Sequence, residues 1–202
     1  MKKGDKRLLI ILVLIVIVGA AITLLPMGEI QPKADSAEAT EQKAETADEE
    51  ATIEETTLIN VDDNAPDFTV EMSDGSTVSM SELRGQVVLV TFFATTCPPC
   101  LNELQRVQTA IIDPFCNRGL KFLPISRGED KATVEAFLKK NGYTFPVGID
   151  TDGSTYNKFA TKYIPRNFLI NRQGVVVEAS VGYDTEEFDA LCKLINMTLM
   201  AR

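Results

Sequence analysis

The chain has 202 residues, with 29 acidic and 20 basic side chains, four Cys, and neither His nor Trp. This length suits one ordinary domain with additional segments rather than two large domains. The lack of histidine excludes Ser-His and Cys-His dyads, His-ligated zinc or copper, and haem attachment through C-x-x-C-H. A net charge of -9 argues against nucleic-acid binding, because such proteins need a basic surface to displace counterions.

The first 25 residues have the pattern of a membrane signal anchor. Residues 1–7 carry a net charge of +3, and residues 8–25 form an apolar run without any charged residue. As a helix this run spans about 27 Å, close to the ~30 Å hydrocarbon core. The basic residues before it predict a single-pass inner-membrane protein whose later residues lie on the periplasmic, extracytoplasmic side. A cleaved signal peptide is the alternative, because the small residues Gly19–Ala21 resemble a cleavage site.

The composition then changes twice. Residues 26–60 contain ten acidic residues, two Lys and no aromatic residue. Such a segment buries too little apolar surface to offset its ordering entropy, which predicts a disordered acidic linker. Residues 61–202 have a globular composition and are numerous enough to form a hydrophobic core. The expected organisation is therefore an anchor over 1–25, a linker over 26–60 and one domain over 61–202.

The first half of this domain predicts a hairpin, a buried strand and a helix. Two short strands, 68–72 and 77–80, flank an Asp-Gly turn. Residues 87–93 (VVLVTFF) are apolar at nearly every position, as in a central strand covered on both faces. The apolar spacing that follows predicts a helix that begins at Cys97 and ends before Pro114.

The second half alternates between strands and helices and ends in a hairpin followed by an amphipathic helix. The expected strands are 121–126, 145–149, 168–170 and 175–180, and the expected helices are 132–141, 154–160 and 186–199. This order predicts an α/β fold with a mixed central sheet flanked by helices.

The reactive chemistry is expected at Cys97-Pro98-Pro99-Cys100, between the buried strand and the following helix. Unpaired N–H groups and the positive end of the dipole at a helix N-terminus favour a thiolate. Cys97 is therefore the expected nucleophile, and Cys100, one turn into the helix, is the expected resolving cysteine. A metal site would need further ligands, and a structural disulfide across two residues would gain little loop entropy. Redox exchange is the favoured interpretation.

The domain resembles the TlpA/ResA-type branch of the thioredoxin superfamily, which are membrane-anchored extracytoplasmic thiol-disulfide oxidoreductases. Three segments carry the resemblance: residues 65–68 with the hairpin that follows, residues 87–100, and residues 163–174. The resemblance implies a thioredoxin-like fold with an N-terminal β-hairpin extension. It also implies a protein-disulfide reductase that uses a CPPC dithiol, with protein dithiol or disulfide clients and an upstream electron donor. Neither a cofactor nor a metal ion is expected.

The resemblance also implies roles for residues outside the motif. Pro165 is expected to be cis and to pack beside Cys97, with the Ile164 backbone available to pair with the substrate. Glu103 is either a proton acceptor for Cys100 or an exposed first-turn residue favoured by the helix dipole. Arg166 stands where a small Thr is common. Its cation is expected either to face the site, where it would hold Cys97 as the thiolate or select acidic partners, or to point outward.

Several alternatives remain open from the sequence. A thiol peroxidase is suggested by the peroxiredoxin-like extension, but Ala94 stands where a peroxidatic motif has Thr. A non-catalytic metallochaperone is the second alternative. Cys116 and Cys192 are either free thiols or a disulfide pair. The two prolines leave Cys100 with the first amide available to Cys97, which predicts weak thiolate stabilisation and a reductant. On this basis Pro98→Gly is expected to lower the Cys97 pKa.

Overall fold

The computed structural model of the protein describes residues 51–201, so the predicted anchor and most of the predicted linker lie outside the described residues. Within residues 51–201 no helix is both long enough and apolar enough to cross a membrane. These residues all belong to one structural unit.

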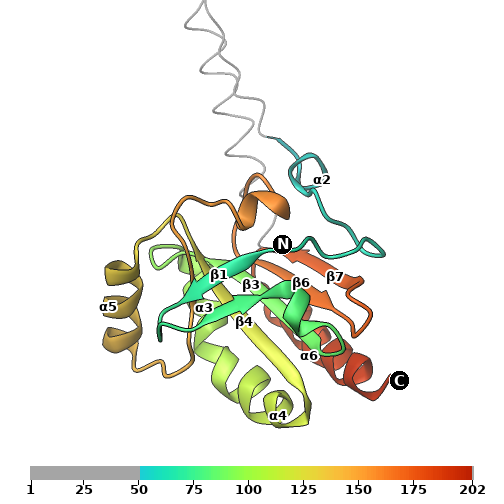
Figure 1. Ribbon diagram of the computed structural model, residues 1–202. Coiled ribbons are helices and arrows are strands. Elements are labelled where there is room, and N and C mark those ends of the chain that lie inside the picture. The colour runs from blue at the N-terminus through green and yellow to red at the C-terminus, as the bar shows by residue number, and fades with distance from the viewer. Residues whose placement is uncertain (1–50, 202) are drawn as a thin grey trace, which may run out of the picture. The chain divides into compact units, whose positions relative to one another are not determined.

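A mixed sheet lies at the centre of this unit (Figure 1). Its strand order is β2-β1-β5-β4-β3-β6-β7. Its strands are β1 (Thr69–Met72), β2 (Thr77–Ser79), β3 (Val87–Phe93), β4 (Leu120–Arg127), β5 (Gly148–Asp150), β6 (Arg166–Ile170) and β7 (Val176–Val181). The pairs β3–β4 and β4–β5 are parallel, and the other neighbours are antiparallel. The predicted mixed sheet and its N-terminal hairpin are therefore confirmed.

Helices and single helical turns connect and cover the strands. They are α2 (Ile53–Thr56), the 3-10 turn η1 (Met80–Leu83), α3 (Pro98–Val107), the π turn η2 (Gln108–Ile112), α4 (Asp113–Phe115), the 3-10 turn η3 (Cys116–Arg118), α5 (Lys131–Asn141), the 3-10 turn η4 (Tyr156–Lys158) and α6 (Thr185–Met200). The helix predicted over residues 154–160 is thus only the single turn η4.

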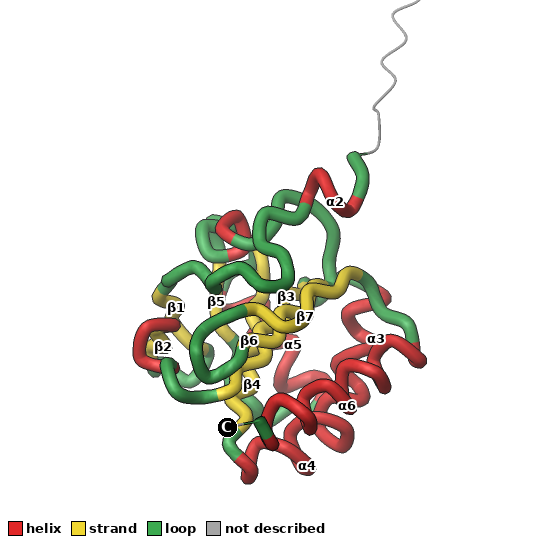
Figure 2. Tube along the Cα trace, turned by 90° about the vertical axis from the view of Figure 1, so that its right-hand side faces the viewer, coloured by secondary structure: helices red, strands yellow, loops and turns green. Residues whose placement is uncertain are grey.

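Two apolar cores lie on the two faces of the sheet. Every residue of β3 is buried, and alternate side chains enter opposite cores, as predicted for a central strand. Helices α3, α5 and α6 contribute to one core, and the N-terminal hairpin with η1 and η4 contributes to the other. Figure 2 shows α3 and α6 next to each other on one side of the sheet. The central strand β3 is therefore covered on both faces of the sheet, and α3 follows shortly after its end.

The helical segment after Cys97 does not end before Pro114, so this expected boundary was wrong. A π turn, in which the Asp113 N–H bonds the Gln108 carbonyl, joins α3 to α4. Pro114 then lies in the first turn of α4, where a helix needs no N–H from it. The chain stays helical up to η3 because the proline coincides with a change in helix type.

The predicted end of the linker at residue 60 was also wrong. Residues 53–56 form α2, Thr56 is buried, and Thr57 pairs with Ala160 as an isolated bridge. The backbone N–H groups of Leu58 and Ile59 bond the Phe159 carbonyl. Residues 51–60 are therefore part of the folded unit, despite their acidic, apolar-poor composition.

Candidate active site

The active-site loop is built by the end of β3 and the start of α3. Cys97 is the N-cap of α3, and its Sγ accepts the Cys100 N–H at 3.4 Å. Pro98 and Pro99 occupy the first two helical positions and bring no N–H of their own. The prediction that Cys100 supplies the first available amide is confirmed.

Cys97 and Cys100 form a disulfide with a Cα–Cα distance of 5.3 Å. The Cys97 side chain is half-buried, whereas Cys100 is fully buried. In thiol-disulfide exchange the accessible sulfur can meet a partner, and the buried sulfur can react only with its neighbour. The exposures agree with the two roles predicted for these residues.

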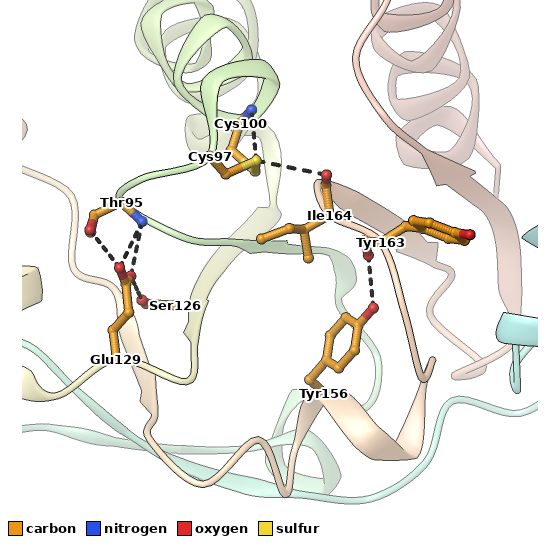
Figure 3. The surroundings of a disulfide bond; sticks show 8 residues. All are labelled: Thr95, Cys97, Cys100, Ser126, Glu129, Tyr156, Tyr163 and Ile164. Carbon is orange, nitrogen blue, oxygen red and sulfur yellow. Dashed lines mark hydrogen bonds between the residues drawn. A yellow bond between two sulfur atoms is a disulfide. The ribbon is translucent and has the colours of Figure 1, made fainter. Parts of the chain in front are cut away.

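The loop before β6 lies against the disulfide. The Ile164–Pro165 peptide bond is cis, as the family resemblance implies, and Cys97 Sγ lies 3.7 Å from the Ile164 carbonyl oxygen (Figure 3). The neighbouring Tyr163 has a positive φ of 68°, and the Tyr156 hydroxyl donates to its carbonyl at 2.7 Å. The loop is thus held by η4 in a fixed position next to the reactive sulfur.

Glu103 lies one helical turn after Cys100 and is 2% exposed, so the expectation of an exposed first-turn glutamate was wrong. Burial raises the pKa of its carboxyl group to about 7, against a smaller lowering by a hydrogen bond from Asn167. Among the described residues its Oε2 has no hydrogen-bond partner. It also lines a cavity of about 10 Å³ beside Asn167 and Tyr183. A carboxyl group in this state can exchange protons near neutral pH.

Asn167 is a site residue that the sequence analysis missed. It is buried on β6 opposite Thr91 of β3, and the Thr91 hydroxyl donates to its side-chain oxygen at 2.6 Å. This bond orients the amide group towards the Glu103 side. A signal was present in the sequence, because an amide two residues after a cis-proline on a buried strand needs a polar partner.

Glu129 was also missed. Its carboxylate accepts the Thr95 N–H at 2.9 and 3.1 Å, and both the Thr95 and Ser126 hydroxyl groups donate to it (Figure 3). Glu129 follows β4, which is parallel to β3, so the ends of both strands meet at one edge of the sheet. A glutamate just after a strand parallel to the motif strand was the available signal.

Both expectations for Arg166 were wrong. Its side chain is 1% exposed and donates to the Thr56 and Thr57 hydroxyls and to the Lys162 carbonyl. It shares its side of β6 with Phe168, which packs in the core opposite α3. The guanidinium therefore neither faces Cys97 nor points outward, because its hydrogen bonds hold it inside the molecule.

Cys116 and Cys192 are free and half-buried, so the disulfide alternative was wrong. Burial raises the pKa of both thiols. The Cys192 sulfur lies 3.7 Å from the Ala110 carbonyl oxygen. Among residues 51–201 no group of three or more Cys, Asp or Glu is arranged to hold a metal ion.

A half-exposed sulfur at a helix N-terminus, paired with a buried one, is the arrangement that thiol-disulfide exchange requires. On a mixed α/β sheet with a cis-proline loop, it places the protein in the class of thioredoxin-like thiol-disulfide oxidoreductases. The family model described as the AhpC/TSA family matches residues 61–179, and the chain belongs to this family.

Similar sequences support the assignment to the thiol-disulfide oxidoreductases. The chain is 33% identical over 123 residues to the thiol-disulfide oxidoreductase ResA of Bacillus subtilis, which covers 61% of this chain and 68% of ResA. It is 32% identical to ResA of Geobacillus kaustophilus, over 66% of this chain and 76% of that protein. The resemblance to ResA-type thiol-disulfide oxidoreductases seen in the sequence is confirmed.

Solved structures agree with this assignment. A proposed protein disulfide isomerase from Bacteroides thetaiotaomicron superposes with a TM-score of 0.69 at 34% identity, covering 72% of this chain and 94% of that one. A thiol:disulfide interchange protein of the thioredoxin family from Chlorobium tepidum has a TM-score of 0.59 at 28% identity, covering 67% and 95%. The thioredoxin-like fold is therefore shown by both sequence and structure.

Proposed function

We propose that this thiol-disulfide oxidoreductase reduces disulfides of client proteins through Cys97 and Cys100. The observation that carries the proposal is the position of Cys97 Sγ at the N-cap of α3, 3.7 Å from the Ile164 carbonyl oxygen. A client segment that pairs with the Ile164 backbone would bring its own sulfur to Cys97. Residues 51–201 hold the Cys97–Cys100 disulfide, which is the oxidised form left after one reduction cycle.

The reaction begins with the dithiol form. The Cys97 thiolate attacks one sulfur of the client disulfide, forms a mixed disulfide and releases the other client sulfur as a thiolate, which takes up a proton. Cys100 then loses its proton and attacks the Cys97 sulfur. This step forms the Cys97–Cys100 disulfide and releases the second client thiol, so two electrons pass to the client. An external dithiol donor must reduce the enzyme again.

Glu103 is the proposed proton acceptor for Cys100. It lies three residues further along α3, is buried on the same side of the helix, and has a pKa raised to about 7 by that burial. A base whose pKa lies near the working pH can take the thiol proton and later return it. The half-exposed Cys97 needs no such partner, because its Sγ already accepts the Cys100 N–H.

Reduction is the proposed direction because Pro99, at the second helical position, withholds an amide that would otherwise be available to the Cys97 thiolate. A weakly stabilised thiolate makes the dithiol form less stable and therefore a better electron donor. We further propose that residues 8–25 anchor the protein in the inner membrane, with the catalytic domain on the periplasmic side. The apolar run and the +3 charge before it support this orientation.

A trapping experiment tests the activity. In Cys100→Ser the second step is blocked, so client proteins should remain attached to Cys97 as mixed disulfides that dithiothreitol releases. Cys192→Ser is the matched control, since that thiol is free and lies outside the motif. The unmodified protein should also reduce insulin and leave hydrogen peroxide unconsumed. Peroxide consumption that depends on Cys97 would instead support the peroxidase alternative.

A protease-protection experiment tests the proposed location. In spheroplasts of a Gram-negative host, external protease should digest the domain, and alkaline extraction should leave the undigested protein in the membrane fraction. Protection of the domain until the membrane is dissolved would contradict the orientation.

A further inference from the structure

The segment Ala51–Thr57 is fastened to the loop that carries the cis-proline. Arg166 Nη1 donates to the Thr57 hydroxyl at 2.7 Å, and Nη2 donates to the Thr56 hydroxyl at 2.8 Å. Arg166 Nε also donates to the Lys162 carbonyl at 3.0 Å, so one side chain joins this segment to the cis-proline loop. A buried guanidinium bonded to neutral oxygens is costly to disturb, which makes the junction rigid.

Other bonds join the same two pieces of chain. The Thr161 N–H bonds the Thr56 carbonyl at 2.9 Å, and the Tyr163 hydroxyl donates to the Ala51 carbonyl at 2.6 Å. The segment begins with a capping box, in which Thr52 and Glu55 bond one another's backbone. Residues 51–57 are therefore an ordered segment that is hydrogen-bonded to the loop beside the active site.

An apolar groove lies between this segment and the active site. The groove has a volume of about 540 Å³, and its lining includes Ile53, Tyr163, Ile164 and Val181. Ile164 belongs both to the groove and to the active site, because its carbonyl oxygen lies 3.7 Å from Cys97 Sγ (Figure 3). Ile53 is 54% exposed, so its side chain is accessible to a partner in the groove. The groove thus reaches the residue whose carbonyl oxygen lies next to the reacting sulfur.

A second hollow continues the groove along the edge of the sheet. It has a volume of about 420 Å³, shares Ile53 and Val181 with the first, and is bordered by Glu178 and Glu187. β7 is the outermost strand at this end of the sheet, so the hollow follows an open edge. Burial raises the pKa of Glu178, and the nearby Glu187 raises it further. The two carboxyl groups border the same end of the hollow, where a basic side chain would relieve their repulsion.

We propose that Ala51–Thr57 forms a wall of the client-binding groove and selects extended client segments with an apolar side chain near the disulfide cysteine and a basic side chain further along. The apolar side chain would lie against Ile53, and the basic one near Glu178 and Glu187. This inference rests on the proposed function, since it names the clients of the same site. Arg166 is the residue that positions the wall.

The test uses the full-length protein in detergent and three disulfide substrates. The first is a peptide with Leu beside a glutathionylated Cys and Lys three residues further on; the second has Ser and Glu at those positions; the third is hydroxyethyl disulfide. The kcat/KM of the unmodified protein should be highest for the Leu-Lys peptide. In Ile53→Ser, the kcat/KM for the Leu-Lys peptide, divided by the kcat/KM for hydroxyethyl disulfide, should fall about fivefold to tenfold. Leu58→Ser is the control, because Leu58 is similarly exposed, at 48%, but does not line the groove.

A charge reversal tests the second hollow. In Glu187→Lys the preference for Leu-Lys over the Ser-Glu peptide should fall about fivefold, whereas the adjacent, exposed Glu186→Lys should keep it. Unchanged ratios in both Ile53→Ser and Glu187→Lys would overturn the inference while leaving the proposed function intact. Failure of the unmodified protein to reduce any of the three disulfides would instead overturn the proposed function.

Discussion

Glu103 shows how one buried group couples the active site to pH. Its pKa is raised from 4.5 to about 7 because burial disfavours the carboxylate. Between these two values the folded protein keeps a proton that the unfolded chain has released. Stability therefore falls as pH rises through this range, and the cost reaches about 3 kcal/mol above pH 7. This cost fits the proposed role of Glu103 as proton acceptor, which requires a group that ionises near neutral pH.

The substitution Glu103→Gln should remove this pH dependence. The variant should be about as stable as the unmodified protein near pH 4 and about 3 kcal/mol more stable near pH 8. Urea unfolding at both pH values measures the effect. The same variant should slow release of a trapped client, because Cys100 loses its proton acceptor. Identical pH dependence of stability in both proteins would contradict the assigned burial effect.

Glu129 acts on the loop rather than on the chemistry. Its carboxylate fixes Thr95, two residues before Cys97, and also satisfies the buried Ser126 hydroxyl. Glu129→Ala should lower the free energy of unfolding by about 2 kcal/mol, because it leaves polar groups without partners. Glu135→Ala, on the exposed side of α5, is the control in urea unfolding. Equal stability of the two variants would show that the hydrogen bonds to Glu129 do not stabilise the loop.

At the scale of elements, the start of α3 decides the character of Cys97. An N-cap side chain accepts hydrogen bonds from the second and third helical residues. Here those residues are Pro99 and Cys100, and only Cys100 has an N–H. Pro98 stands at the first position, whose amide is not needed for capping. The structure therefore identifies Pro99, and not Pro98 as expected from the sequence, as the proline that withholds a capping amide from Cys97.

Pro99→Ala should therefore lower the Cys97 pKa by about 1, because it restores an amide that can bond the thiolate. Pro98→Ala is the matched control and should change this pKa much less. The ultraviolet absorbance of the thiolate, followed against pH in the reduced protein, gives both values. A larger decrease in Pro98→Ala than in Pro99→Ala would show that the amide at the first position is the one that matters.

Elements with strong local signals could be predicted from the sequence. The apolar run of β3, the Asp-Gly hairpin and the amphipathic helix α6 all lie within a few residues of their expected bounds. β5 was expected over 145–149 but covers only Gly148–Asp150, because residues before it enter the core without strand pairing. The π turn before Pro114 was missed because apolar spacing does not distinguish a π turn from an α-helical one.

At the scale of the whole molecule, the site is assembled from distant segments. Cys97, Cys100 and Pro165 could be recognised because a motif or a family resemblance marked them. Glu129 was missed and the surroundings of Arg166 were predicted wrongly, since their roles depend on contacts 34 and 110 residues away in the chain. Composition likewise misplaced the start of the domain, because residues 51–60 are held by tertiary hydrogen bonds rather than by their own apolar content.

The start of the domain can be tested by truncation. A chain that begins at residue 51 should keep nearly full stability, whereas a chain that begins at residue 61 should lose about 3 kcal/mol. The shorter chain lacks the two threonine hydroxyls that accept from Arg166, so a buried cation loses most of its partners. Thermal unfolding of both chains measures the difference. Equal melting temperatures would restore the boundary at residue 60.

The contact between Arg166 and the Thr56–Thr57 pair also constrains how the sequence can evolve. A guanidinium buried against two hydroxyl groups cannot change to Lys or Thr without leaving polar atoms unsatisfied. Selection should therefore act on the three positions together. Among homologous chains, Arg after the cis-proline should occur with hydroxyl residues at both N-terminal positions, and a small residue there should occur without them. Independent variation of the three positions across an alignment would show that their contact is not selected.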